Sequence, residues 1–279
     1  MAIPLSFILY LNACGSEGNT NTATTTGLNP GESQFEMNES AGEKALKAKQ
    51  KMNALFNQVL TKHKEDKVFT EKATIAQKQW EAYANAQWDM KFPHYENAES
   101  GTTGYGSVGS MCSAEYRAEL YDARIKELTV WVEGVPEGDA CSGSVGFSNN
   151  TATGANQGES GNGTSEIKGT TQGEMNASAG NIDEKAEQKM NTLFNQILNK
   201  YKEDKFFTEK AKIAQKQWGA YAKAQLKMKY PNSEDSAVEP MCAAMYRTEL
   251  CNARIKELNI WMEGIAEGDV CSGSVGNKQ

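Results

Sequence analysis

The chain has 279 residues, which suits two domains of roughly 100 residues with connections between them. Its formal net charge of −7 argues against sequence-independent binding of nucleic acid, because such binding needs a basic face. An acidic surface favours cationic partners and does not by itself identify one.

Residues 1–14, MAIPLSFILYLNAC, form a short apolar run that ends in Cys14. The run is too short to cross a bilayer as a helix. It resembles the lipobox of a bacterial lipoprotein signal, in which the cysteine is lipidated and becomes the first residue of the mature chain. Gly15 rather than Asp follows it, so the resemblance implies an anchor in the outer membrane, facing the periplasm or the cell surface. No Lys or Arg precedes the run, which leaves an ordinary secretory signal or a chance match as the alternatives.

Two stretches rich in Gly, Ser, Thr and Asn divide the rest of the chain. Such compositions bury too little apolar surface to order themselves. We expect the two repeats that they separate to reorient relative to each other. The predicted organisation is a flexible tether over residues 15–41, a first repeat over 42–142, a disordered linker over 143–180, a second repeat over 181–272 and a tail over 273–279.

The two repeats are copies of each other. Residues 51–93 recur as residues 189–231, with 32 of 43 positions identical. Residues 111–146 recur as residues 241–276, with 25 of 36 positions identical. The chain is therefore one unit duplicated in tandem, and its function must account for a unit used twice.

Each repeat shows the 3.6-residue periodicity of three amphipathic helices and no strand-like alternation. In repeat 1, Thr70 is a plausible N-cap of the second helix, Pro93 closes that helix, and Gly134 ends the third. The predicted fold class is all-α, with each repeat an antiparallel helical hairpin plus a third helix. The apolar stripes contain Met52, Leu55, Phe56, Val59 and Leu60 in the first helix, Ala76, Trp80, Tyr83, Ala84 and Gln87 in the second, and Tyr121, Ile125, Leu128 and Val132 in the third.

Four cysteines occupy duplicated positions: Cys112 and Cys141 in repeat 1, and Cys242 and Cys271 in repeat 2. They lack CxxC spacing and histidines are rare, so they predict disulfides of an oxidising compartment rather than a zinc site. The helix after Cys112 rises about 27 Å, and the roughly ten residues beyond it reach about 33 Å only when fully extended. A Cys112–Cys141 bond is thus possible but taut, and pairing between the repeats stays open.

The sequence offers no catalytic constellation. His63 and His94 both lie in repeat 1, and Tyr201 replaces His63 in repeat 2, whereas a catalytic histidine would be expected in both copies. No phosphate-binding glycine loop or nucleophile elbow occurs, and the duplicated Glu-Gly-Asp has too few carboxylates for a calcium loop. Cys251 aligns with Tyr121 and is expected to be a buried thiol, with a reactive or intermolecular cysteine as the alternative. We predict a protein that is not an enzyme and uses no metal or cofactor.

A set of Gln, Trp, Tyr, Arg and Leu residues recurs in both repeats at helical spacing. Arginines on an apolar stripe usually bury their stems and pair with a carboxylate or with helix-end carbonyls. The set is therefore expected to be mainly structural, with ligand binding as the alternative. It comprises Gln77, Trp80, Tyr83, Arg117, Leu120 and Arg124, and their counterparts Gln215, Trp218, Tyr221, Arg247, Leu250 and Arg254.

The succession AQKQWEAYANAQ, GYGSVGSMC and YRAELYDARIKEL in repeat 1 resembles the LprI-type lysozyme-inhibitor domain. That family has an amphipathic first helix, an AQxxWxxYR-like second helix, a Gly-Ser loop, a cysteine and an R-x-x-L helix. The similarity runs from residue 42 to 128 and again from residue 181 to 258. Several elements in the same order, present twice, make a chance match improbable.

Two departures from the family pattern matter. Family members typically have a cysteine near the end of the second helix, where Trp88 and Leu226 stand here. The resemblance therefore leaves the cysteine that precedes each third helix to find another partner, for which Cys141 and Cys271 are the candidates. Repeat 2 has also lost the Gly-Ser motif and has residues 235–240, DSAVEP, in its place.

The resemblance implies a non-catalytic protein of the bacterial envelope that binds lysozyme and protects peptidoglycan. Lysozymes are commonly cationic, which suits the acidic charge of the chain. We hypothesise that the Gly-rich loop Gly104-Tyr105-Gly106-Ser107 meets the partner, because such a loop presents backbone polar groups; a plain connection between helices is the alternative. The rival function is an envelope scaffold or adhesin whose paired helical domains have no affinity for lysozyme.

Overall fold

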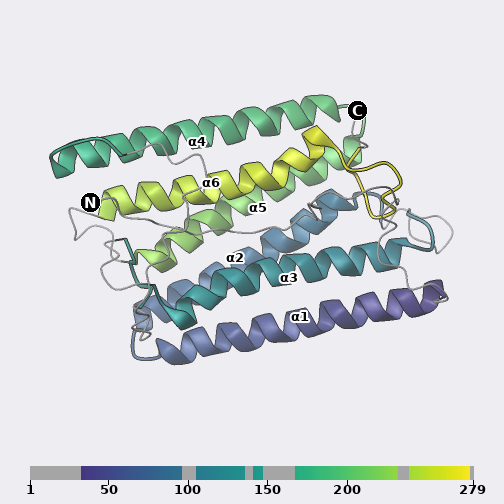
Figure 1. Cartoon of the computed structure of the whole chain (residues 1–279), viewed down its shortest axis with the longest axis horizontal. Coiled ribbons are helices and arrows are strands. Elements are labelled where there is room, and N and C mark those ends of the chain that lie inside the picture. Colours follow the sequence, from purple (N-terminus) through teal and green to yellow (C-terminus); the bar gives the residue numbers. More distant parts are fainter. Residues whose placement is uncertain (1–32, 96–104, 136–140, 147–166, 232–238, 277–279) are drawn as a thin grey trace, which may run out of the picture.

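The computed structural model describes five stretches of the chain, and their regular structure is helical (Figure 1). These stretches are residues 33–95, 105–135, 141–146, 167–231 and 239–276. The predicted signal with Cys14, and most of the predicted tether and linker, lie outside the described residues.

Each repeat contributes three long helices. Repeat 1 contains α1 (Gln34–Lys62), α2 (Lys67–Lys91) and α3 (Gly109–Glu133). Repeat 2 contains α4 (Gln172–Lys200), α5 (Lys205–Lys229) and α6 (Glu239–Glu263). The prediction of an all-α fold built from two three-helix repeats is confirmed.

The first helix of each repeat begins earlier than the sequence indicated. At the start of α1, the Ser33 hydroxyl accepts from the N–H of Glu36 (3.3 Å), and the Glu36 carboxylate accepts from the N–H of Ser33 (2.8 Å). The same capping box starts α4 at Thr171. The prediction of a tether is therefore wrong for residues 34–41, and the prediction of a linker is wrong for residues 172–180. Reciprocal capping and the helix formers that follow it outweigh the polar composition.

The N-cap of α2 also differs from the prediction, which placed it at Thr70. The helix begins after Asp66, whose Oδ1 accepts from the N–H of Phe69 at 2.9 Å. Asp204 caps α5 in the same way through the N–H of Phe207. A carboxylate is favoured at the N-cap because it accepts from a free N–H group and also interacts favourably with the positive end of the helix. Thr70 lies within the first turn.

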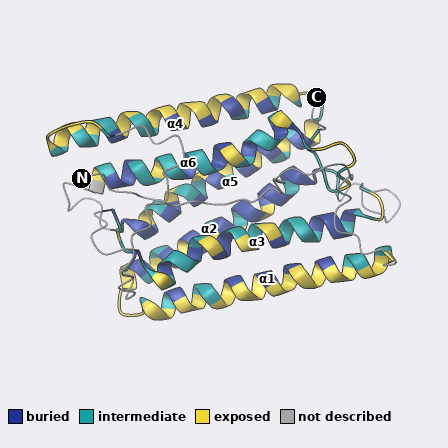
Figure 2. Cartoon of the chain, in the orientation of Figure 1, coloured by how far each residue is buried: buried dark blue, intermediate teal, exposed yellow. Residues whose placement is uncertain are grey.

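The two repeats pack into one helical body. Within each repeat the first helix packs along the third, α1 on α3 and α4 on α6, while α2 of repeat 1 packs along α5 of repeat 2 (Figure 1). The outer helices α1 and α4 each expose one face, and α2 and α5 between them are more buried (Figure 2). The main hydrophobic core contains residues of both repeats. The expectation that the repeats reorient is therefore wrong, since the second helix of each buries its surface against the other.

Both disulfides join one repeat to the other. The pairs are Cys112–Cys271 and Cys141–Cys242, with Cα–Cα distances of 5.0 and 5.1 Å. Of the pairings that the sequence left open, the structure has the one between repeats. The taut bond within repeat 1 is not formed, because each of its cysteines bonds to a cysteine of repeat 2.

The segment after each third helix crosses to the other repeat. The N–H of Ser144 donates to the carbonyl of Lys229 at the end of α5 (2.8 Å), and the N–H of Ser274 donates to the carbonyl of Lys91 at the end of α2 (2.7 Å). Helix ends leave carbonyls without intrahelical partners, and each crossing segment supplies the missing donor. The duplicated CSGSVG sequence is thus a cap that each repeat places on the second helix of the other.

The crossing segments need glycine at one position. Gly143 has a φ of +59° and Gly273 a φ of +60°, and a Cβ at either would collide with the lysine carbonyl that the segment caps. Residues 143–146 and 273–276 therefore belong to the packed body, and not to the linker and tail to which their composition assigned them.

Candidate functional site

A polar cluster lies at the centre of the interface between the repeats. Arg124 of α3 is fully buried. Its Nε donates to Gln77 Oε1 (3.1 Å) and its Nη1 to Glu127 Oε2 (2.8 Å). Nη1 also lies 3.3 Å from the hydroxyl of Tyr221 and 3.3 Å from Oε1 of Gln225, both in repeat 2. One arginine therefore joins the two repeats.

Repeat 2 contains the equivalent set of contacts. Arg254 of α6 is also fully buried and donates from Nε to Gln215 Oε1 (3.0 Å) and from Nη1 to Glu257 Oε2 (2.9 Å). Its Nη1 reaches across to the hydroxyl of Tyr83 (3.0 Å) and to Oε1 of Gln87 (2.9 Å) in repeat 1. The hydrogen bonds of the cluster are thus related by an approximate two-fold symmetry.

Two tyrosines of the cluster stack on each other. The rings of Tyr83 and Tyr221 have centroids 5.7 Å apart and planes inclined by 4°. Each hydroxyl donates to a glutamate of the opposite repeat, Tyr83 to Glu257 at 2.6 Å and Tyr221 to Glu127 at 2.8 Å. Burial raises the pKa of both tyrosines well above its ordinary value, so both remain protonated donors at neutral pH.

The central cluster is closed to ligands. Both guanidinium groups have no exposed area, and each pairs with a carboxylate, Arg124 with Glu127 and Arg254 with Glu257. A ligand could reach them only if the repeats separated. Buried polar networks that are largely satisfied specify one arrangement of the elements that carry them. The duplicated Gln, Tyr and buried Arg residues therefore fix how the two repeats meet.

The loop that we hypothesise to meet a partner lies where α3 begins. Gly104 is outside the described residues. Tyr105 is half-buried, and its ring packs edge-on against Phe92 with centroids 5.4 Å apart. Gly106 has a φ of +69° and faces open space, and Ser107 is exposed. The described part of the loop is thus anchored by one aromatic ring and presents its last residues to solvent.

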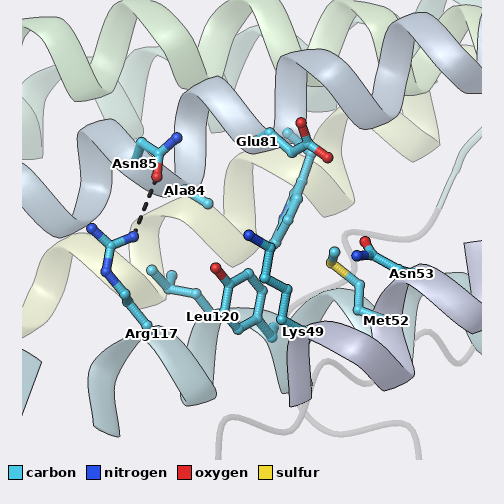
Figure 3. A pocket seen from close by; sticks show the side chains of 10 residues that line it. Lys49, Met52, Asn53, Glu81, Ala84, Asn85, Arg117 and Leu120 are labelled. Atoms are coloured by element: carbon cyan, nitrogen blue, oxygen red, sulfur yellow. Dashed lines mark hydrogen bonds between the residues drawn. The ribbon is translucent and has the colours of Figure 1, made fainter. Parts of the chain in front are cut away.

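A groove opens on the surface of repeat 1 between α1, α2 and α3 (Figure 3). Its volume is about 170 Å³. Arg117 lies at one end, where its Nη1 donates to Asn85 Oδ1 (3.3 Å) and its guanidinium lies 4.3 Å from the centroid of the Trp88 ring. Figure 3 shows Met52 at the other end and Lys49 between them. The groove therefore combines two cationic side chains with a lining of mixed polar and apolar groups.

The equivalent arginine of repeat 2, Arg247, has a different partner. The Nε of Arg247 donates to Asp183 Oδ2 at 2.7 Å, which is a bond between α6 and α4. The position of Asp183 is held in repeat 1 by Ala45. The carboxylate partner expected for these arginines is present for Arg247, but Arg117 has an amide and an aromatic ring instead. The remaining duplicated residues are apolar and pack in the core or at its edge: Trp80, Trp218, Leu120 and Leu250.

A match to a family model shows to which proteins this chain is related. The family model for the lysozyme inhibitor LprI matches residues 27–128 and 164–258. The chain belongs to the LprI family. It contains two tandem LprI copies, in agreement with the resemblance seen in the sequence. No curated protein and no solved structure matches the chain.

The LprI match covers the three helices of each copy almost to their ends. It stops at Leu128 in the first copy and at Leu258 in the second, before the crossing segments begin. The LprI similarity thus accounts for the copies, whereas residues beyond it carry two of the cysteines and the caps that bind the copies together.

Four residues of the interface between the two copies were not predicted from the sequence as site residues. These are Gln87, Glu127, Gln225 and Glu257, which bond to the buried arginines. A signal was available in the sequence, because each glutamate follows an arginine by three residues and each glutamine follows a tyrosine by four, in both copies.

Three other features of the described residues bear on function: metal sites, membrane spans and the free thiol. They contain no cluster of three His, Cys, Asp or Glu side chains placed to hold a metal ion. None of the described helices has the length and apolar character that a membrane span requires. Cys251 is buried, and burial raises the pKa of its thiol to about 11, so the reactive thiolate is scarce at neutral pH.

Proposed function

We propose that this chain is a lysozyme inhibitor held in the bacterial cell envelope. The observation that carries the proposal is the match to the LprI family over both copies and most of the chain. An inhibitor of this kind needs no chemistry of its own, because it acts by occupying a surface of the enzyme. The acidic net charge of −7 supports encounter with cationic lysozymes, most strongly at low salt.

The geometry supports binding as one preorganised body. Two disulfides and the central cluster fix the copies relative to each other. A partner that contacts residues of both copies therefore meets a surface that is already assembled, which lowers the entropy lost on binding.

We further propose that the partner docks on the end of the body that carries Ser107, which we call the loop end. Asn38 in the first turns of α1 donates to the Ser107 carbonyl (3.5 Å), and Cys112 lies beside the carbonyl of Val270. Large apolar side chains are exposed at this end, Phe35 by 74% and Val270 by 50%. Exposed apolar side chains rimmed by polar groups are typical of protein interaction surfaces.

The envelope location is proposed on the strength of the lipobox-like sequence that ends in Cys14. Lipidation there, with two or more acyl chains, would hold the helical body at a membrane surface. Cys14→Ser should release the protein from the membrane fraction of the producing cell. Retention of the variant in that fraction would reject the lipid anchor.

Inhibition is tested by a muramidase assay on a peptidoglycan suspension, titrated with the oxidised soluble body from Gly15 onward. We expect stoichiometric inhibition of at least one of several lysozyme types, stronger at low salt. Folded, oxidised protein that inhibits none of them would overturn the proposal and leave a helical binding module with another partner.

The loop end is tested with two matched valine variants. Val270→Ser, at the loop end, should weaken inhibition by about tenfold, because a buried apolar contact is lost. Val68 is 45% exposed and lies at the start of α2, the end of that helix away from the loop end. Val68→Ser should therefore leave inhibition unchanged. Equal inhibition by both variants would place the partner elsewhere.

A further inference from the structure

We propose that the groove of repeat 1 between α1, α2 and α3 is a binding site for a carboxylate group. The carboxylate comes either from an acidic side chain of a protein partner or from a small free acid. The site stands on the contacts of Arg117 and Lys49 and does not depend on the inhibition of lysozyme.

The second repeat shows what ligand this arginine position takes. Arg247 binds the carboxylate of Asp183 at 2.7 Å, and the side chain of Asp183 is only 14% exposed. Repeat 1 has Ala45 at the position of Asp183, so Arg117 has lost the carboxylate that its counterpart holds. A carboxylate from outside the chain would restore the pair.

Arg117 is held ready for such a ligand. Its one hydrogen bond within the described part of the chain goes to Asn85, and its guanidinium lies on the face of Trp88, 4.3 Å from the ring centroid. A guanidinium carries five N–H donors in a planar fork that matches the two oxygens of a carboxylate. Stacking on an aromatic ring fixes the plane of the fork and leaves most of its donors for a ligand.

Lys49 adds a second positive charge to the groove. It is exposed and makes no hydrogen bond or ion pair with any described residue. Repeat 2 has Glu187 at this position, which would repel an anion. The carboxylate that lines the groove of repeat 1 is Glu81, so its two cations outweigh its one anion. In a chain with a net charge of −7, this local excess of positive charge favours an acidic ligand.

The groove has room for the group that it would bind. Its volume of about 170 Å³ accommodates the end of an acidic side chain or a small organic acid. Met52, Trp80 and Leu120 line it with apolar groups, and Asn53 and Asn85 add polar groups beside the two cations.

The test is an NMR titration of the oxidised soluble body with N-acetyl-L-glutamate, and with N-acetyl-L-glutamine as the uncharged control. We expect a saturable shift of the Arg117 Nε–Hε signal, assigned from its loss in Arg117→Gln, with the acid and not with the amide. Lys49→Glu, which copies repeat 2 at an exposed position, should weaken binding by about tenfold or more. Arg247→Gln is the matched control in repeat 2 and should leave the affinity unchanged.

Two results would overturn the proposal. One is the absence of a saturable shift at Arg117 in folded protein. The other is an equal response of Lys49→Glu and the unaltered protein, since a carboxylate in the groove must sense this charge.

The source of the carboxylate follows from the muramidase assay with the same variants. If Lys49→Glu and Arg117→Gln weaken both the inhibition of lysozyme and the binding of N-acetyl-L-glutamate, an acidic side chain of the enzyme is the source. If they weaken only the binding of N-acetyl-L-glutamate, the ligand is a free acid. If no lysozyme is inhibited at all, the proposed function fails, while the NMR titration still decides whether the groove binds a carboxylate.

Discussion

The central cluster and the two outer arginines, Arg117 and Arg247, show opposite outcomes of the same duplication. In the cluster, Arg124 and Arg254 have matching partners, and each reaches a tyrosine and a glutamine of the other repeat. At the outer positions, Arg117 lies on a tryptophan whereas Arg247 binds an aspartate. Each buried arginine of the cluster bonds to residues of the opposite copy, so a substitution in one copy disturbs the contacts of both. Each outer arginine bonds only within its own copy, and at these positions the copies differ.

The largest expected effect comes from the cluster. Arg124→Met removes the buried partner of Glu127 and of Tyr221, and we expect it to lower the free energy of unfolding by about 3–5 kcal/mol. Arg254→Met should cost a similar amount, because its contacts are the same. Arg117→Met, in the half-exposed groove, should cost about 1 kcal/mol or less. Urea unfolding followed by circular dichroism measures all three, and equal effects of Arg117→Met and Arg124→Met would contradict the difference between the two regions.

The disulfides are expected to contribute next. Replacing both Cys112 and Cys271 by alanine should lower the free energy of unfolding by about 2–4 kcal/mol, because the bond closes a loop of 159 residues. The pairing itself can be checked by engineering a protease site between residues 147 and 166. After cleavage, the halves should migrate together on a gel without reductant and separately with it. Separation without reductant would show that the bonds lie within the repeats.

The crossing segments should be sensitive at a single glycine. Gly273→Ala places a Cβ against the carbonyl of Lys91 and forces a positive φ on alanine, so we expect a loss of about 1–3 kcal/mol in the free energy of unfolding. Gly219→Ala, in α5 with open space around it, should instead stabilise by about 0.5–1 kcal/mol. Urea unfolding measures both variants. An unchanged free energy of unfolding in Gly273→Ala would mean that the segment does not cap α2 in solution.

The smallest effect concerns the difference between His63 and its counterpart Tyr201. Burial, together with the nearby charge of Lys62, lowers the pKa of His63, whose ring packs 4.2 Å from that of Phe69 between centroids. Because the unfolded chain takes up this proton at a pH of about 6.5, the contribution of neutral His63 is complete above that pH and is lost as the pH falls through the lowered folded pKa. Tyr201 occupies the same place and donates a hydrogen bond to the carbonyl of Trp261 (3.2 Å).

His63→Tyr should therefore make the melting temperature less dependent on pH between about pH 7 and pH 5. The comparison of melting curves for the variant and the unaltered protein across this range measures it. An unchanged pH dependence in His63→Tyr would show that this histidine is not held neutral by the fold.

The sequence by itself determined the helices and the duplication. Helical periodicity is local, because residues three and four apart share a face whatever covers it, and so Met52, Val59 and Leu128 could be placed on buried faces without a partner in view. The same kind of comparison paired Cys112 with Cys242 and Arg124 with Arg254 as equivalent positions. Composition was a poorer guide at the boundaries, where the capping residues Ser33 and Thr171 start helices inside stretches that look polar.

Only the tertiary structure decided which surfaces meet. A stripe on α2 indicates a buried face but does not say that α5 of the other repeat buries it, since such contacts join residues more than one hundred positions apart. The disulfide pairing, the crossing segments and the symmetric hydrogen bonds of the cluster all depend on that one arrangement. The different partners of the outer arginines also emerged only from the structure, which pairs Arg247 with Asp183 and Arg117 with Asn85. Local spacing fixes the elements, whereas the contacts between them are set by which burial of apolar surface is largest for the whole chain.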